Sequence, residues 1–251
     1  MWRYHDSILK LDPTEVRDRF RGCMLGLAIG DALGMPVETM TEEQILDGTG
    51  GRGVEGFLAP LHERFHSTCR LRPGQWTDDT QLARAIARSL VRRGTFDLDD
   101  IANAHVEAYH GDRRGWGGST TRGIAELAEG KRKPDEPVID TSASGLGNGV
   151  AMKIAPVALF FLGRAHDLLR LGVAVDSISD LTHRDAVAYW GALAIAYAIR
   201  DCAIQERVST TETTIRTVAD SIGWVSEQGH TKLLLERLNV VAHGTSEQIA
   251  V

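Results

Sequence analysis

The chain has 251 residues, of which 43% are hydrophobic, 25% charged and 6% aromatic, and its formal net charge at pH 7 is −6. These proportions are ordinary for a soluble globular protein and argue against disordered or fibrous classes. The negative charge and the scarcity of aromatic side chains argue against a nucleic-acid-binding surface. The three cysteines lie far apart without a CxxC motif, which predicts reduced thiols in a cytoplasmic protein.

No targeting or membrane-spanning segment is expected. The first six residues carry charges and no long apolar stretch follows them, unlike a secretory signal. The longest apolar runs, 157–163 and 190–199, fall well short of the ~20 residues of a spanning helix.

The apolar residues follow a helical period along the chain. The segment Asp-Pro-Thr-Glu at 12–15 predicts a helix start, because aspartate caps the helix, proline suits its first position and glutamate completes a capping box. We expect this helix to stop at Gly30. A second, short helix is expected from Thr41, with Gln44 completing its capping box, to Gly48.

Glycines interrupt the helical pattern in the middle of the chain. Five glycines between 48 and 56 predict a loop. A strong helix is expected over 78–93, where leucine or isoleucine recurs at every fourth position until Gly94 ends it. Further helices are expected from Asp97 and over 119–129, 150–163, 165–171, 176–182, 185–203, 211–221 and 230–241, with a loop over 131–149.

Strand-like alternation, internal repeats and a flexible linker are not apparent in the sequence. We therefore predict an all-α fold, a single compact multi-helix domain of about ten helices that spans 1–251. In such a fold the chemistry is expected in the loops between the helices.

The segment Thr77-Asp78-Asp79 places two carboxylates side by side at the start of a predicted helix. Adjacent carboxylates repel each other, and a hard divalent cation such as Mg²⁺, Mn²⁺ or Ca²⁺ would relieve that repulsion through oxygen ligands. Aspartates in a first helical turn also satisfy free N–H groups there. Metal binding and capping are both open interpretations of this segment.

Three other segments admit similar alternatives. The glycines of 144–149 could let backbone N–H groups approach an anion, or could form an ordinary turn; they match neither a P-loop nor a dinucleotide-binding fingerprint. Glu38 taken alone suits a solvated surface carboxylate. His183 taken alone suits a structural histidine as well as a functional one.

A literal HExxH motif is formed by His62, Glu63 and His66. In zinc peptidases the two histidines of this motif bind the metal and the glutamate is the general base. A third ligand at a diagnostic spacing is not apparent, and an ordered pair of surface histidines is the alternative.

Five segments taken together, in order, are the most specific feature of the sequence. They are RGCMLGLAIGDALGMPVE (21–38), GQWTDDTQLARAIARSL (74–90), GWGGSTTRGIAEL (115–127), SGLGNGVAMKIAPVAL (144–159) and LTHRDAVAYWGALAIAYAI (181–199). In this order the chain resembles the ADP-ribosylglycohydrolase family, which includes the dinitrogenase-reductase-activating glycohydrolases and the ADP-ribosyl-acceptor hydrolases.

The resemblance implies an all-α hydrolase that cleaves the glycosidic bond between ADP-ribose and an acceptor side chain with the help of two Mg²⁺ ions, or of Mn²⁺ in their place. It implies that Thr77, Asp78 and Asp79 are metal ligands. It implies that Glu38 and Asp79 are the catalytic carboxylates. The substrate-binding residues that it implies are Gly117, Gly118, Ser144, Gly145, Gly147, Asn148, Gly149, Met152 and His183. The expected partner is an ADP-ribosylated protein or small molecule.

The family's C-terminal DxDT segment, which supplies further metal ligands, has no counterpart in the sequence. Asp220 is the only aspartate after Asp201. We therefore expect fewer ions than in the family, and either weak or absent hydrolysis or a second copy of the chain that covers the exposed apolar surface and completes the site. A protein that binds ADP-ribose without cleaving it is the alternative function.

Overall fold

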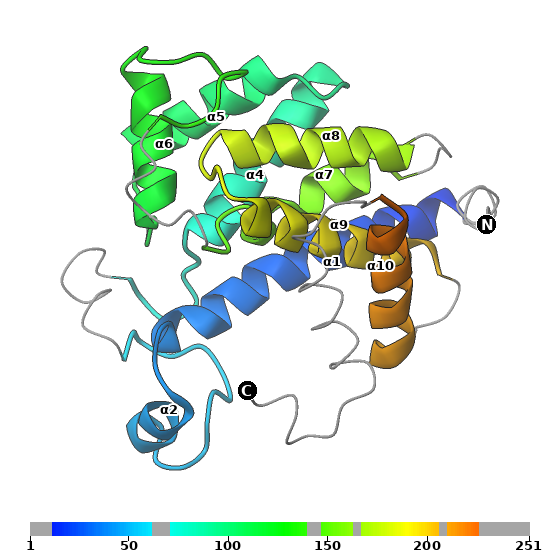
Figure 1. Ribbon diagram of the computed structural model, residues 1–251. Coiled ribbons are helices and arrows are strands. Elements are labelled where there is room, and N and C mark those ends of the chain that lie inside the picture. Colours follow the sequence, from blue (N-terminus) through cyan, green and yellow to red (C-terminus); the bar gives the residue numbers. More distant parts are fainter. Residues whose placement is uncertain (1–11, 62–70, 140–146, 163–166, 206–209, 226–251) are drawn as a thin grey trace.

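The computed structural model describes residues 12–61, 71–139, 147–162, 167–205 and 210–225. Within these ranges the chain is helical and has no β-strand, as the sequence predicts (Figure 1). The α-helices are α1 (Pro13–Gly34), α2 (Glu42–Gly48), α4 (Asp78–Arg93), α5 (Leu98–His110), α6 (Gly118–Ala128), α7 (Ala155–Phe160), α8 (Asp167–Asp180), α9 (Ala186–Ile204) and α10 (Thr211–Val225), and the short 3₁₀ helices are η2 (Met35–Val37) and η3 (Ala151–Lys153).

Helix α1 begins where the sequence predicts but ends later. The Asp12 side chain accepts a hydrogen bond from the backbone N–H of Thr14 at 2.7 Å. The expected end at Gly30 is wrong, because the helix continues to Gly34. A helical glycine costs only about 1 kcal/mol, and the tertiary contacts of Asp31 and the burial of Ala32 hold the extra turn in place.

The next helices follow their local signals closely. Helix α2 carries the predicted capping box between Thr41 and Gln44. Helix α4 ends at Gly94, whose φ of 65° is the left-handed conformation that glycine tolerates best. Helix α5 starts after Asp97, whose side chain accepts from the backbone N–H of Asp100. Caps are local interactions, so the sequence predicts them well.

Two predicted stretches are divided differently in the structure. The helix expected over 150–163 is broken at Ile154 into η3 and α7, and Pro156 starts the new helix in its first turn. The two helices expected over 165–171 and 176–182 are one helix, α8. Its buried residues Leu171, Ala174, Val175 and Ile178 form one continuous apolar face that carries the helix past Gly172. The helix expected over 230–241 lies outside the described residues.

The hydrophobic core is built around α9. This helix packs against α7, α8 and α10, while α4 packs against α5 and α7 (Figure 1). Each of these helices contributes a fully buried side chain to one cluster: Ile86 from α4, Ile101 from α5, Val157 from α7, Ile178 from α8, Leu193 from α9 and Ile222 from α10. The core therefore fixes where the ends of α4, α8 and η3 lie, and these ends carry the predicted site.

Two stretches are long and apolar enough to cross a membrane by length and composition alone. They are Pro13–Val37, which joins α1 to η2, and Ala186–Ile204, which is α9. The packing of α9 in the core accounts for its apolar character. Helix α1 is more exposed: Leu25 and Ile29 are 58% and 48% exposed, and Ala32 is its one buried residue. The absence of a membrane partner stays a prediction.

Candidate functional site

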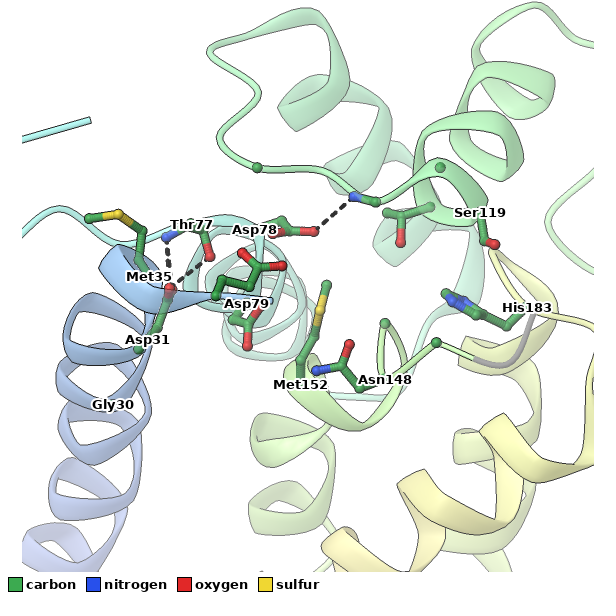
Figure 2. A pocket seen from close by; sticks show the side chains of 18 residues that line it. Gly30, Asp31, Met35, Thr77, Asp78, Asp79, Ser119, Asn148, Met152 and His183 are labelled. Atoms are coloured by element: carbon green, nitrogen blue, oxygen red, sulfur yellow. Dashed lines mark hydrogen bonds between the residues drawn. The ribbon is translucent and has the colours of Figure 1, made fainter. Parts of the chain in front are cut away.

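A pocket of about 410 Å³ opens between the C-terminal end of α1, the N-terminal ends of α4 and α6, and the turn between α8 and α9 (Figure 2). The structure brings together in it nearly every residue that the sequence nominates: Glu38, Thr77, Asp78, Asp79, Gly117, Gly118, Gly147, Asn148, Gly149, Met152 and His183. Ser144 and Gly145 lie outside the described residues, as do His62, Glu63 and His66 of the HExxH motif. The segments that line the pocket are therefore distant in sequence and adjacent in space.

Asp31 is a pocket residue that the sequence reasoning missed. It lies in the last turn of α1, and its carboxylate holds the start of α4 (Figure 2). The hydroxyls of Thr77 and Thr80 donate to it at 2.7 and 2.6 Å. The backbone N–H groups of the same two residues donate to it at 2.9 and 3.0 Å. A carboxylate near the C-terminal end of a helix opposes the helix dipole, and that mismatch was the signal that Asp31 has another partner.

The hydrogen bonds of Asp31 also bear on whether the carboxylates of Asp78 and Asp79 cap α4 or are free to bind a metal. It takes the capping role at α4, because it accepts from the N–H groups of both Thr77 and Thr80. Thr77 is the N-cap residue by position, but its hydroxyl bonds to Asp31 and caps no N–H of α4. Asp78 and Asp79 follow in the first turn and line the pocket (Figure 2). Their carboxylates are thus available for chemistry there.

The electrostatics of these two aspartates are unfavourable in the protein alone. Burial, followed by the charge of Asp79, raises the pKa of Asp78 to about 7. Burial, followed by the charges of Asp31 and Glu38, raises the pKa of Asp79 to about 6. Two carboxylates with raised pKa values in one cleft are typical of sites that bind a proton or a cation.

Glu38 reaches the pocket from a tight turn. It follows η2, and the backbone N–H of Met40 closes the turn by donating to the carbonyl of Val37 at 3.0 Å. Thr39 within this turn has φ 67°, a left-handed conformation that is rare for a β-branched residue. The turn therefore places Glu38 at the pocket beside Asp78 and Asp79, whose pKa values its charge helps to raise.

The loop before α6 is anchored on α4. The indole N–H of Trp116 donates to the side chain of Gln81 at 2.8 Å, and the amide of Gln81 donates to the carbonyl of Asp112 at 2.8 Å. The backbone N–H of Gly117 then points to Asp78 Oδ2 at 3.4 Å (Figure 2). These hydrogen bonds place Gly117 and Gly118 in the pocket beside Asp78.

The segment 147–149 lies against the imidazole of His183. A Cβ placed on Gly149 would lie 2.4 Å from His183 Cε1 and 3.0 Å from the Thr120 hydroxyl. Glycine at 149 is thus required by close approach. The element that follows is η3, a 3₁₀ helix of three residues, so the expectation of a full helix start behind this loop is wrong. Any anion held here would be bound by the loop's own backbone and by side chains.

His183 is a buried side chain at the turn between α8 and α9, and 3% of it is exposed. Its Nδ1 lies 2.8 Å from the hydroxyl of Thr182. Burial, followed by the charge of Lys153, lowers the pKa of His183 to about 4. The imidazole is therefore neutral at physiological pH, and it is directed into the pocket (Figure 2).

The donor set of the pocket suits a hard cation. Asp78 and Asp79 offer carboxylate oxygens, and Mg²⁺ is commonly bound through one or two carboxylates together with water and substrate phosphate. Among the residues that the structure describes, no group of three or more His, Cys, Asp or Glu side chains is arranged to hold a metal ion.

Comparison with known proteins identifies one matching family model. The ADP-ribosylglycohydrolase family model matches residues 12–249. The chain is 36% identical over 156 residues to the ADP-ribosyl-[dinitrogen reductase] glycohydrolase of Rhodospirillum rubrum, covering 61% of this chain and 48% of the relative. It is 36% identical over 168 residues to the ADP-ribosylarginine hydrolase Tri1 of Pseudomonas putida, covering 63% of this chain and 39% of the relative.

A vertebrate relative is similar over a longer stretch. The ADP-ribosylhydrolase ARH3 of Xenopus tropicalis is 29% identical over 187 residues, which cover 72% of this chain and 49% of the relative. The chain thus spans about half the length of the curated relatives it matches. From the family match over nearly its whole length, we conclude that the chain belongs to the ADP-ribosylglycohydrolase family.

Proposed function

We propose that this chain hydrolyses the glycosidic bond between ADP-ribose and an acceptor on a protein or small molecule, with Mg²⁺, or Mn²⁺ in its place, as cofactor. The observation that carries the proposal is that carboxylates from α1–η2 and α4 share one pocket with the glycine loop 147–149 and with His183. The relatives whose printed names specify a glycohydrolase, an arginine hydrolase and an ADP-ribosylhydrolase support the same reaction class.

Asp78 and Asp79 are the proposed metal-binding pair, with Thr77 beside them. Burial and then the neighbouring carboxylates raise both pKa values, and a divalent cation would lower both by direct attraction. When bound, such an ion would orient substrate hydroxyls and acidify a bound water.

The other residues of the pocket have roles that their chemistry suggests. Departure of the acceptor develops positive charge on the ribose, which Glu38 and Asp79 would stabilise as carboxylates. The loop 147–149, together with Gly117 and Gly118, would bind the diphosphate and ribose through backbone groups. Binding energy from these remote contacts would hold the scissile bond in place.

The proposal is tested by assaying the full chain on ADP-ribosylated arginine, ADP-ribosylated serine and a small-molecule ADP-riboside, with Mg²⁺ and with EDTA. We expect release of ADP-ribose from at least one substrate, dependent on Mg²⁺. Asp79→Asn should abolish release. Asp135→Asn, at an exposed position in the loop 131–139, should leave release unchanged. Tight binding of ADP-ribose without turnover would instead support the binding-protein alternative, and neither binding nor turnover would refute both.

A further inference from the structure

A chain of buried hydrogen bonds runs from η3 to the imidazole that lines the pocket. The Lys153 side chain is fully buried, and its ammonium Nζ lies 3.1 Å from the hydroxyl oxygen of Thr182. That same hydroxyl oxygen lies 2.8 Å from Nδ1 of His183. Thr182 is 1% exposed, so water does not compete for these partners.

The direction of each bond follows from counting hydrogens. Burial lowers the pKa of Lys153 to about 7, so below that pH its side chain is an ammonium group. An ammonium group has donors and no acceptor, so Lys153 then donates and the Thr182 oxygen accepts. The threonine hydroxyl has one hydrogen, and the remaining partner of its oxygen is Nδ1 of His183. The oxygen could also accept from an Nδ1–H group, but the buried hydroxyl hydrogen would then lack an acceptor among the described residues, which is costly. The hydroxyl therefore donates to Nδ1, which is the unprotonated nitrogen of the ring. In a neutral imidazole the single N–H is then on Nε2.

The protonated nitrogen faces the pocket. A Cβ placed on Gly149 would lie 2.9 Å from Nε2 of His183, and one placed on Gly147 would lie 3.7 Å from it. Both glycines line the pocket, and the imidazole is directed toward them (Figure 2). An N–H at this position is presented to whatever the loop binds.

We infer that Lys153 and Thr182 are positioning residues that hold His183 in the Nε2–H tautomer, so that it donates a hydrogen bond to a phosphate or hydroxyl oxygen of the bound ligand. The ligand in this inference is ADP-ribose, which rests on the proposed function. The tautomer itself follows from the hydrogen bonds of Thr182 with the charged Lys153 and does not depend on the ligand. A ring free to switch its proton would spend part of its time presenting a lone pair, which would repel an ionised phosphate oxygen.

The protein contains an internal reference for the measurement. His105 is also buried, and its Nδ1 lies 2.8 Å from the carbonyl oxygen of Ile101. A carbonyl can only accept, so Nδ1 of His105 carries the hydrogen. The two buried histidines are thus expected in opposite tautomers, and both have pKa values lowered by burial and by Lys153.

The first test is the tautomer of His183 in the ligand-free full chain at about pH 5.5, below the pKa of Lys153 and above that of His183. Long-range ¹H–¹⁵N correlation spectra distinguish Nδ1–H from Nε2–H rings, and His183→Gln and His105→Gln variants assign the two sets of signals. We expect Nε2–H at His183 and Nδ1–H at His105. An Nδ1–H tautomer at His183 would overturn the inference, whatever the protein binds.

The second test separates positioning from simple structural support. Thr182→Val removes the hydroxyl and Thr182→Ser keeps it. We expect the valine variant to lose the pure Nε2–H signature and to bind ADP-ribose about threefold to tenfold more weakly, the loss of one neutral hydrogen bond. The serine variant should retain the wild-type signature and bind within about twofold of wild type.

Lys153→Met provides a second route if the valine variant does not fold, because it removes the donor and leaves the hydroxyl in place. It should give a mixed tautomer at His183 and the same direction of change in affinity. Unchanged affinity in a variant whose tautomer has changed would overturn the role of His183 as a donor. Failure of the wild-type chain to bind ADP-ribose would refute the proposed function instead, and the spectra would still decide the tautomer.

Discussion

At the scale of single residues, Asp31 decides where α4 begins and how its first turn is presented. Its carboxylate accepts from four donor groups, the backbone N–H and the hydroxyl of Thr77 and of Thr80, at the start of another helix. This arrangement leaves Asp78 and Asp79 facing the pocket. The carboxylate of Asp31 thus positions those of Asp78 and Asp79, although it is distant from them in sequence.

Asp31→Ala should destabilise the chain markedly. The change removes a helix cap and leaves two threonine hydroxyls without their acceptor, a combined loss of about 2 kcal/mol or more in the free energy of unfolding. Denaturant unfolding measures this. The matched control is Asp12→Ala, which removes the exposed cap of α1 and should cost about 1 kcal/mol or less. Equal losses in the two variants would contradict the role given to Asp31.

The pKa of Asp78 leads to a prediction about pH. Its pKa is about 7 in the folded chain, above the ordinary value of 3.8, so between these pH values the folded state holds a proton that the unfolded state has released. In EDTA the free energy of unfolding should therefore fall as pH rises from about 4 to 7.

Asp78→Asn removes this titration. We expect the variant to be more stable than wild type by about 1 kcal/mol or more near pH 8, with the difference vanishing near pH 4. Denaturant unfolding at the two pH values measures it, and Asp135→Asn should leave the free energy of unfolding within about 0.5 kcal/mol at both. A gain that is the same at both pH values would show that the charge of Asp78 is not its cause.

At the scale of elements, the turn between α8 and α9 is held from outside the pocket by Arg132. Its guanidinium donates to the carboxylate of Glu126 at 2.9 Å and to the carbonyls of Gly123 at 2.9 Å and Leu181 at 2.5 Å. Helix α6 also packs closely on this turn, because a Cβ on Gly123 would lie 2.7 Å from the Leu181 carbonyl oxygen. The turn that carries His183 is therefore clamped between α6 and η3.

Arg132→Met should destabilise the protein by about 3 kcal/mol or more, because it leaves the buried carboxylate of Glu126 without its cation. It should also weaken ADP-ribose binding by releasing the turn. Denaturant unfolding and calorimetry measure the two effects. The neighbouring control is Lys131→Met, which breaks an exposed ion pair with Glu129 and should cost about 0.5 kcal/mol or less. Similar costs for the two variants would refute the clamp.

At the scale of the whole molecule, the chain combines an extensive helical core with a proposed metal site that has two adjacent aspartates as ligands. It spans about half the length of its curated relatives, and the described residues offer Asp78 and Asp79 as the proposed ligand pair. Affinity for a divalent cation depends on the number of charged ligands. We therefore expect half-maximal hydrolysis at a Mg²⁺ concentration on the order of a millimolar.

Initial rates measured against Mg²⁺ concentration test this expectation, with the solution mass determined at the same protein concentration. The mass also tests whether the chain associates with a second copy, as the sequence predicts. A monomer with full turnover at micromolar Mg²⁺ would show that the residues of this chain hold the ion tightly and need no partner.

The sequence by itself determined the helical class and most helix boundaries, because caps and apolar periods act within a few residues. Thr41 with Gln44, and Asp97 with Asp100, are such local pairs. The motifs whose residues line the pocket could also be recognised in the sequence, because each lies within one short segment.

The tertiary structure alone decided the rest. Helix α1 passes Gly30 because Asp31 bonds to residues 46 and 49 positions away. Helix α8 passes Gly172 because its apolar face packs continuously in the core. Lys153 meets Thr182 across 29 positions, which orients His183. Such bonds depend on which helices pack together, and no short window of sequence contains both partners.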